Sequence, residues 1–358
     1  MSFLPNIDMK EVTRLTRGGK LGEAMALLQG GRTTAPPPAP SLHSPLTLPA
    51  FSGKLSGLLG RLPAGRTGIA PAPAPIPAGA RFEEFSFSNQ AGSRAYKLYV
   101  PSLYAGEPVP LVVMLHGCTQ SPDDFAAGTR MNELAEEMGF LVVYPGQLQS
   151  ANMQKCWNWF SPADQARDQG EPSLIAGITR QVMMAFEVDP ASVYIAGLSA
   201  GGAAAAIMGA AYPDLYSAIG VHSGLACGAA RDMPSAFAAM RQGGPASRGA
   251  GRPVPTIVFH GDSDSTVNPV NGDQVIAQSK ASADLHIVEK SGVSEGGTRF
   301  TRRIEADPSG KSVIEHWVLH GAGHAWSGGS AAGSYTDPRG PDASREMMRF
   351  FLQHHLTA

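Results

Sequence analysis

Cysteine is scarce in this chain, with three residues in 358. A small, odd number argues against a fold built on a disulfide framework. No spacing of cysteine and histidine is typical of a zinc site, and we expect neither a metal nor a cofactor. One pairing stays open, because Cys118 and Cys156 both lie in predicted loops where they can form a bridge or remain thiols. Cys227 follows a small apolar run and is expected to fill buried space.

Long apolar runs are also missing. No stretch of 18 apolar residues occurs in the sequence, which argues against a transmembrane helix. Charged residues, among them Lys10, Arg14 and Lys20, interrupt the region in which a signal peptide needs an apolar core. We therefore expect no signal peptide and a cytoplasmic location, where the reducing environment favours thiols over a disulfide.

Neither sign of charge is in excess. The chain has 28 Lys and Arg residues against 30 Asp and Glu residues, a formal net charge of -2. Without a basic stripe, the surface lacks the charges that neutralise phosphates, so nucleic acid is not an expected partner.

The composition changes twice along the chain. Residues 31–80 are rich in Pro, Ala, Gly and Ser and lack the apolar pattern of a folded segment, which predicts an extended linker. Residues 1–30 differ, because apolar residues recur there at helical spacing and predict a short amphipathic helical segment. The remaining residues, 81–358, are numerous enough for one large domain with its own core.

Within residues 81–358, short apolar stretches alternate with helical patterns. Residues 82–88 and 95–100 alternate like a hairpin of edge strands, and the continuous apolar run 111–115 is typical of a central parallel strand. The helical patterns cover residues 123–138, 174–186, 200–211, 271–282 and 343–354. This order predicts an α/β fold with a mostly parallel, doubly wound sheet and helices on both faces. No insertion of the size of a lipase lid is visible, so we expect an open cleft.

A serine stands at a predicted turn between a strand and a helix. Residues 193–196 form a short apolar, β-branched stretch, and an alanine-rich helical stretch follows Ser199. Gly197 and Gly201 flank the serine, as the sharp turn of the G-x-S-x-G motif requires. Ser199 is therefore the candidate nucleophile.

A nucleophilic serine needs a base, and the base needs a carboxylate that holds its tautomer. Asp262 and Asp264 follow the predicted strand 256–261, and His320 and His324 follow a later strand near the end of the chain. The order serine, acid, histidine is that of the α/β-hydrolases. The position of the acid a few residues beyond the strand favours Asp264, and the glycine-flanked loop favours His324.

The oxyanion donors are expected beside the nucleophile. The predicted central strand 111–115 is followed by His116, Gly117 and Cys118. A glycine after that strand lets the main chain approach the serine, so that an N–H can point at the developing negative charge. The predicted donors are the N–H groups of Cys118 and Ala200.

Tryptophans stand near these segments. Trp157 and Trp159 lie in a long polar stretch, and Trp326 follows His324 by two residues. Exposed aromatic rings beside a catalytic loop offer apolar contact to acyl chains or stack on sugars, so all three are candidate substrate contacts. The alternative, expected for one of Trp157 and Trp159, is that the ring pins the loop to the core.

From about Arg81 to its end, the chain resembles the polyhydroxybutyrate depolymerase family of esterases, α/β-hydrolases related to feruloyl and acetylxylan esterases. The resemblance rests on LHGCTQ at residues 115–120, CWNWF at 156–160, GLSAGG at 197–202 and GHAW at 323–326. It implies an α/β-hydrolase catalytic domain over residues 81–358. The roles that it implies agree with those above: Ser199 as nucleophile, Asp264 and His324 as its partners, and Cys118 and Ala200 as oxyanion donors.

The expected function is hydrolysis of polyhydroxyalkanoate polymer or its oligomers through an acyl-enzyme. Two alternatives remain: a feruloyl or acetylxylan type of carbohydrate esterase, and a non-catalytic granule-associated protein on a hydrolase scaffold. The expected partner is the ester substrate or a polyester granule, and residues 8–30 could associate with the granule surface through their apolar face.

Overall fold

A computed structural model describes residues 75–245, 252–280 and 285–356 of the chain. By its contacts the chain divides into two units, Met1–Ile69 and Ala70–Ala358, and every described element belongs to the second unit. The predicted amphipathic segment of residues 1–30 lies outside the described residues, as does the predicted linker up to residue 74.

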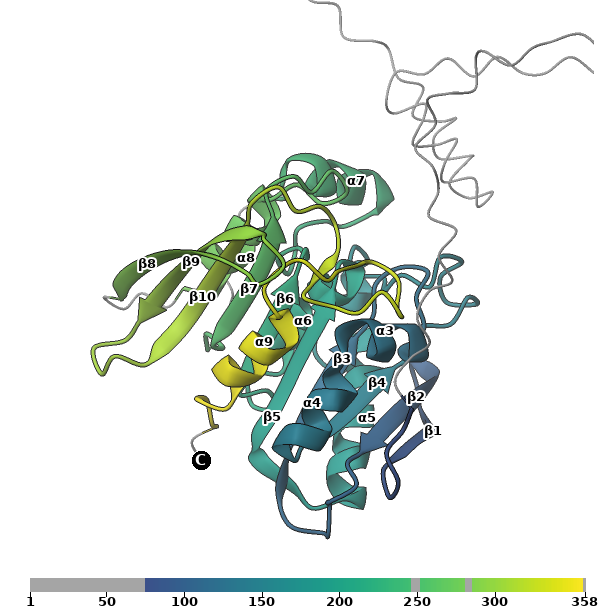
Figure 1. The fold of residues 1–358 in the computed structure, drawn as a ribbon. Helices are drawn as coiled ribbons and strands as arrows, with labels where there is room; N and C mark the ends of the chain where they lie inside the picture. Colours follow the sequence, from purple (N-terminus) through teal and green to yellow (C-terminus); the bar gives the residue numbers. More distant parts are fainter. Residues whose placement is uncertain (1–74, 246–251, 281–284, 357–358) are drawn as a thin grey trace, which may run out of the picture. The chain divides into compact units, whose positions relative to one another are not determined.

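One large sheet organises the second unit (Figure 1). Within the described residues it has ten strands in the order β1-β2-β4-β3-β5-β6-β7-β10-β9-β8. The strands are β1 (Arg81–Asn89), β2 (Gly92–Val100), β3 (Val109–Leu115), β4 (Leu141–Pro145), β5 (Val188–Leu198), β6 (Ala218–His222), β7 (Thr256–Gly261), β8 (His286–Val293), β9 (Arg299–Ala306) and β10 (Ser312–Leu319). Neighbours from β4 to β10 are parallel, whereas both edges are antiparallel. The predicted α/β-hydrolase architecture is confirmed.

The burial of the strands explains their composition. Central strands such as β4 and β6 are buried over their whole length, which suits continuous apolar sequences. The edge strands β1 and β8 are more exposed, and β9, the neighbour of β8, contains Arg299, Arg302 and Arg303. The apolar pattern of the sequence missed β9, because a strand close to an exposed edge of the sheet does not need an apolar face.

Helices cover both faces of this sheet (Figure 1). They are α3 (Pro122–Thr129), α4 (Met131–Met138), α5 (Gly170–Ala185), α6 (Ala200–Ala211), α7 (Met233–Gln242), α8 (Val270–Ser279) and α9 (Ala343–Phe351). The core on one face packs against α5 and α6, and the core on the other packs against α3, α4 and α9. Successive residues of β5 serve the two cores in turn: Ile195 belongs to the first and Tyr194 to the second.

The structure corrects one expectation about a helix and answers one question that the sequence left open. The single helix predicted over residues 123–138 is two helices, because Arg130 takes the left-handed conformation (φ 57°) and its N–H closes α3 on the Ala126 carbonyl. Cys118 and Cys156, for which both states were open, form a disulfide. The third cysteine, Cys227, is half-buried, and burial raises the pKa of its thiol to about 11.

Two short strands, β11 (Trp326–Ser327) and β12 (Thr336–Asp337), pair in parallel near the end of the chain. They belong to the segment between β10 and α9, which also contains His324. Over the described ranges, no helix has both the length and the apolar character that a membrane crossing requires.

Candidate active site

Ser199 lies directly between β5 and α6, at the carboxyl edge of the sheet. Its main chain has φ 58° and ψ -119°, a conformation that residues other than glycine rarely adopt. A Cβ at Gly197 would collide with the Gly201 carbonyl, and one at Gly201 would collide with the Leu115 carbonyl. The glycines of the motif are therefore needed for close packing, as expected of a nucleophile elbow.

Asp264 and His324 are in contact. The Oδ2 atom of Asp264 lies 2.7 Å from Nδ1 of His324, and its other oxygen accepts the N–H groups of Thr266 at 2.8 Å and Val267 at 2.9 Å. Burial by itself raises the pKa of this carboxyl, but the contacts of His260 and His324 outweigh that effect and hold the pKa of Asp264 well below its usual range. A charged Asp264 can therefore orient the ring of His324 and stabilise its protonated form.

The competing residues form a separate pair. Asp262 Oδ2 lies 3.0 Å from His320 Nδ1, and Asp262 Oδ1 accepts the N–H of Gly321 at 2.7 Å. This pair is more exposed than the pair of Asp264 and His324. The structure thus brings together the two residues chosen from the sequence, and it joins the two rejected ones to each other.

His222, at the end of β6, connects the segments of Ser199 and His324. Its carbonyl accepts the N–H of Ser199 at 2.9 Å, and its Nε2 accepts the N–H of Ser327 at 3.0 Å. Its ring stacks on Trp326 with 5.1 Å between the ring centroids. Burial, with a smaller effect of His260 and His324, lowers the pKa of His222 to about 3, so the ring is a neutral acceptor at pH 7. No local sequence pattern marks His222, because its contacts are with segments that are distant along the chain.

The predicted oxyanion segment, residues 116–119, lies against Ser199. Leu115 is paired with Gly197 in the sheet, so the residues after β3 and β5 emerge side by side. A Cβ at Gly117 would lie 3.6 Å from the Cβ of Ser199. Within the described part of the chain, the N–H groups of Cys118 and Ala200 donate no hydrogen bond, so both remain available to an oxyanion.

The loop between β4 and α5 packs against residues 116–119. Thr119 N–H donates to the Gln154 carbonyl at 2.6 Å, and Cys156 is bonded to Cys118. Trp157 Nε1–H donates to the His116 carbonyl at 3.1 Å. The loop therefore contacts each of the residues 116, 118 and 119.

The expectation that Trp326 and one of Trp157 and Trp159 expose their rings to substrate is wrong. Trp157 and Trp326 are 0% exposed and Trp159 is 6% exposed. The indole N–H of Trp157 donates to the His116 carbonyl, and that of Trp326 donates to Ser344 Oγ at 3.0 Å. Trp157 and Trp326 are buried because each satisfies its polar atom inside the protein while its apolar surface packs in the core. The alternative, that the ring pins the loop, describes Trp157.

A different aromatic ring, that of Tyr335, is exposed beside residues 116–119. Tyr335 is 47% exposed, and its hydroxyl lies 3.4 Å from Oγ1 of Thr119. Its carbonyl accepts the N–H of Trp326 at 2.7 Å, and its φ of 52° is in the left-handed region. Tyr335 thus lies between the oxyanion segment and the segment of His324. No sequence pattern marks Tyr335, since it is a single tyrosine in a polar loop.

Metal ligands do not cluster here. Among residues 75–245, 252–280 and 285–356, no three His, Cys, Asp or Glu side chains converge as the ligands of a metal ion do.

A strained serine after a parallel strand, a buried Asp and His pair and two unpaired main-chain N–H groups are together the features of an α/β-hydrolase. The Esterase PHB depolymerase family matches residues 94–299, which is more than half of the chain, and the chain belongs to this family.

Two curated relatives illustrate the similarity. The chain is 33% identical over 255 residues to poly(3-hydroxyalkanoate) depolymerase C of Paucimonas lemoignei, covering 67% of this chain and 60% of that protein. It is 34% identical over 140 residues to feruloyl esterase B of Neurospora crassa, covering 39% of this chain and 46% of that protein. The match thus spans at most 60% of the length of these two relatives.

Among solved structures, an acetyl xylan esterase from Aspergillus awamori aligns with a TM-score of 0.57. The alignment covers 76% of this chain and 99% of that chain, at 19% sequence identity. At this identity the match supports the fold.

Proposed function

We propose that this protein is a serine esterase that hydrolyses ester bonds of polyhydroxyalkanoate polymer or its oligomers through an acyl-enzyme intermediate. The observation that supports the proposal most directly is the 2.7 Å contact of Asp264 with His324, at the same edge of the sheet as the strained Ser199. The membership in the Esterase PHB depolymerase family points to the same chemistry.

The mechanism has two halves. His324 takes the proton of the Ser199 hydroxyl as its oxygen attacks the ester carbonyl, and the resulting oxyanion accepts the N–H groups of Cys118 and Ala200. The alcohol leaves with the proton from His324. Water then attacks the acyl-enzyme in the same way and releases the acid. Asp264 stays charged throughout and stabilises the imidazolium.

The polyester is favoured as the substrate because the similarity to the Paucimonas lemoignei depolymerase extends over 67% of this chain. In the absence of an exposed tryptophan, Tyr335 is the side chain that we assign to contact with the acyl part of the substrate. A feruloyl or acetylxylan type of activity is the second candidate, since the similarity to feruloyl esterase B includes 140 residues.

The decisive experiment compares wild type with Ser199→Ala on amorphous polyhydroxybutyrate, feruloyl esters and acetylated xylan. We expect hydroxybutyrate release by the wild type and its loss, by at least about 1,000-fold, in the variant. Release of ferulate or acetate instead would transfer the assignment to the second candidate. Absence of Ser199 labelling by a fluorophosphonate would favour the non-catalytic, granule-associated protein.

The cellular location is part of the proposal. The proposed location is the cytoplasm, where residues 8–30 attach the protein to polyester granules. Deleting residues 8–30 should then reduce the fraction of protein that sediments with isolated granules, while hydrolysis of a soluble ester stays unchanged. Undiminished sedimentation would remove the granule role from this segment.

The redox state of two cysteines tests the compartment directly. Disulfides such as Cys118–Cys156 are rare in cytosolic proteins of most organisms. Alkylating intact cells before lysis and weighing the protein distinguishes the two cases. Modification of all three cysteines agrees with the cytoplasm, whereas modification of Cys227 alone contradicts a reducing compartment.

A further inference from the structure

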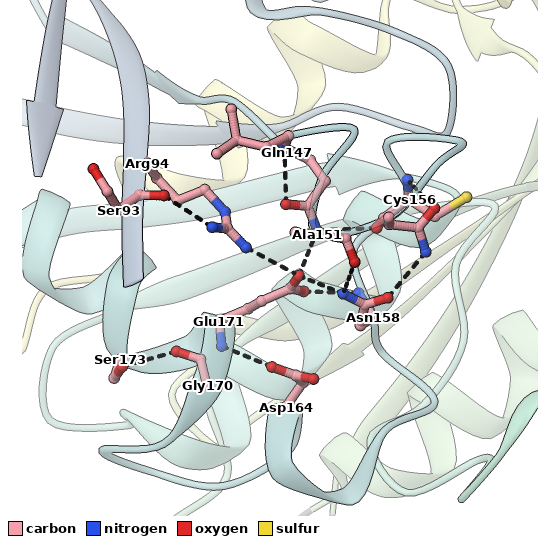
Figure 2. A network of polar contacts seen from close by, with 12 residues as sticks. Ser93, Arg94, Gln147, Ala151, Cys156, Asn158, Asp164, Gly170, Glu171 and Ser173 are labelled. Atoms are coloured by element: carbon pink, nitrogen blue, oxygen red, sulfur yellow. Dashed lines mark hydrogen bonds and ion pairs between the residues drawn. The ribbon is translucent and has the colours of Figure 1, made fainter. Parts of the chain in front are cut away.

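Glu171 is a buried carboxylate that the proposed reaction does not use. It lies in the first turn of α5 and is 5% exposed. Three N–H donors converge on it (Figure 2): the main-chain N–H of Asn158 at 2.7 Å, the side-chain amide of Asn158 at 2.8 Å, and the side-chain amide of Gln147. The guanidinium of Arg94, itself 7% exposed, lies 3.5 Å away. Removing a carboxylate from water costs free energy even when four polar groups surround it, so we expect Glu171 to have a function.

The donors belong to one loop. Gln147 stands near the beginning and Asn158 near the middle of the connection between β4 and α5, and Gln147 also donates to the Cys156 carbonyl at 3.0 Å. Asn158 further binds Asn152 inside the loop, at 2.9 Å between the side chains. As Figure 2 shows, Glu171 joins the start and the middle of this connection to the first turn of α5. The carboxylate therefore helps to hold residues 147–158 in their conformation.

The same loop contacts the oxyanion segment through main-chain and covalent links. Gln147 N–H donates to Nε2 of His116 at 3.0 Å, and the Nδ1 of that ring lies 2.7 Å from the Gly117 carbonyl. Burial lowers the pKa of His116 to about 4, so the ring is neutral and can bridge the two groups. The disulfide and the bond from Trp157 to His116 add two more links. A displacement of the loop would therefore also displace residues 116–118, and with them the N–H of Cys118.

We propose that Glu171 is a positioning residue of the oxyanion hole: it holds the loop of Gln147 and Asn158, and the loop in turn holds the N–H of Cys118 where the oxyanion forms. This inference rests on the proposed esterase function. The position of a main-chain N–H depends on the conformation of its segment. The contacts of the neighbouring loop with that segment therefore determine where the N–H of Cys118 lies. Small displacements of such donors have large effects, because the stabilisation is strongest at the transition state.

The test is Glu171→Gln, which keeps the size of the side chain but replaces an acceptor oxygen with an NH2 group that faces other donors. We expect kcat for a soluble p-nitrophenyl ester to fall about 10- to 100-fold, with KM changed less than about threefold. The Ki of a boronic acid that mimics the tetrahedral intermediate should rise by about the same factor as kcat/KM falls. A merely structural role would lower the melting temperature and leave kcat and this Ki unchanged in the folded protein.

The matched control is Glu136→Gln. Glu136 also accepts three hydrogen bonds, from Tyr99 Oη at 2.6 Å, Ser102 N at 2.8 Å and Ser102 Oγ at 2.7 Å, but it lies on α4 and contacts none of the residues 116–119. This variant should be less stable and keep kcat within about twofold. A loss of kcat equal to that of Glu171→Gln would overturn the inference.

A second variant covers the case in which Glu171→Gln does not fold. Asn158→Ala removes the side-chain donor to Glu171 and leaves the buried carboxylate with Arg94, Gln147 and the main-chain N–H of residue 158. We expect the same pattern on a smaller scale, a several-fold fall in kcat with little change in KM. Wild-type kcat in Asn158→Ala, or in a folded Glu171→Gln, would overturn the inference but not the esterase function. A wild-type protein without activity on any ester would overturn both.

Discussion

The carboxylate of Asp262 binds the imidazole of His320, with 3.0 Å between Oδ2 and Nδ1. Four residues after His320 stands His324, bound in the same way by Asp264 at 2.7 Å. The two pairs look alike in sequence but differ in burial: the side chains of Asp262 and His320 are 40% and 34% exposed, and those of Asp264 and His324 are 0% and 11% exposed. Since charges interact more strongly away from water, the buried pair is the better candidate for catalysis.

This difference predicts the outcome of two parallel substitutions. Asp264→Asn should reduce kcat by about 10,000-fold, because His324 loses the carboxylate that sets its tautomer and stabilises its charge. Asp262→Asn should change kcat less than about fivefold. Steady-state kinetics with a p-nitrophenyl ester measures both, and circular dichroism checks the fold. A larger loss in Asp262→Asn would exchange the roles of the two pairs.

Buried neutral histidines make the stability depend on pH. Burial is the main cause that lowers the pKa of His222 to about 3 and of His116 to about 4, from an ordinary value of 6.5. Below pH 6.5 the unfolded chain therefore binds protons that the folded protein does not, and the free energy of unfolding decreases as the pH falls from 6.5 towards 4. At pH 5 the effect is about 2 kcal/mol for each histidine.

Urea unfolding at pH 7 and pH 5 checks this prediction. His222→Gln has no titrating ring, so it should lose about 2 kcal/mol less than wild type between the two pH values, although it is less stable at pH 7. His286→Gln, on the exposed strand β8, is the control and should behave like wild type. An identical loss in wild type and His222→Gln would contradict the burial of a neutral ring.

Tyr335 is expected to act on substrate binding rather than on chemistry. Tyr335→Ala removes an exposed ring beside Thr119, and a contact of this kind contributes about 1 kcal/mol, or about fivefold in KM. Tyr335→Phe keeps the ring and should resemble wild type. Leu103→Ala, which removes an 82% exposed side chain between β2 and β3, should have no effect on KM. A fall in kcat with constant KM in Tyr335→Ala would argue against a substrate contact.

The disulfide should contribute to stability. It joins residues that are 38 positions apart, for which the loop-entropy treatment gives about 4 kcal/mol. The double variant Cys118→Ser, Cys156→Ser should therefore unfold at a lower urea concentration than wild type, and dithiothreitol should shift wild type in the same direction. Cys227→Ser in the presence of oxidant serves as the control. An unchanged midpoint in the double variant would show that the loop is held by its hydrogen bonds alone.

Several features could be predicted because they depend on residues that are close in sequence. The turn at Ser199 is one, since the glycines at positions 197 and 201 determine which main-chain conformations and contacts are possible. The alternation of apolar strands with helices is another, because each element has its own period and the parallel sheet follows from their order. The family resemblance also came from short continuous motifs.

Other features were decided only by the tertiary structure. The sequence favoured Asp264 and His324, but only the fold shows that Asp262 and His320 bind each other. It also shows that Trp326 is buried while Tyr335 is exposed, and that Glu171 is enclosed by donors from a loop. Burial and pairing depend on contacts between segments that are far apart along the chain. Local patterns therefore predicted which residue types stand at the sheet edge, whereas the packing of distant segments decided which of them face each other, the interior or the solvent.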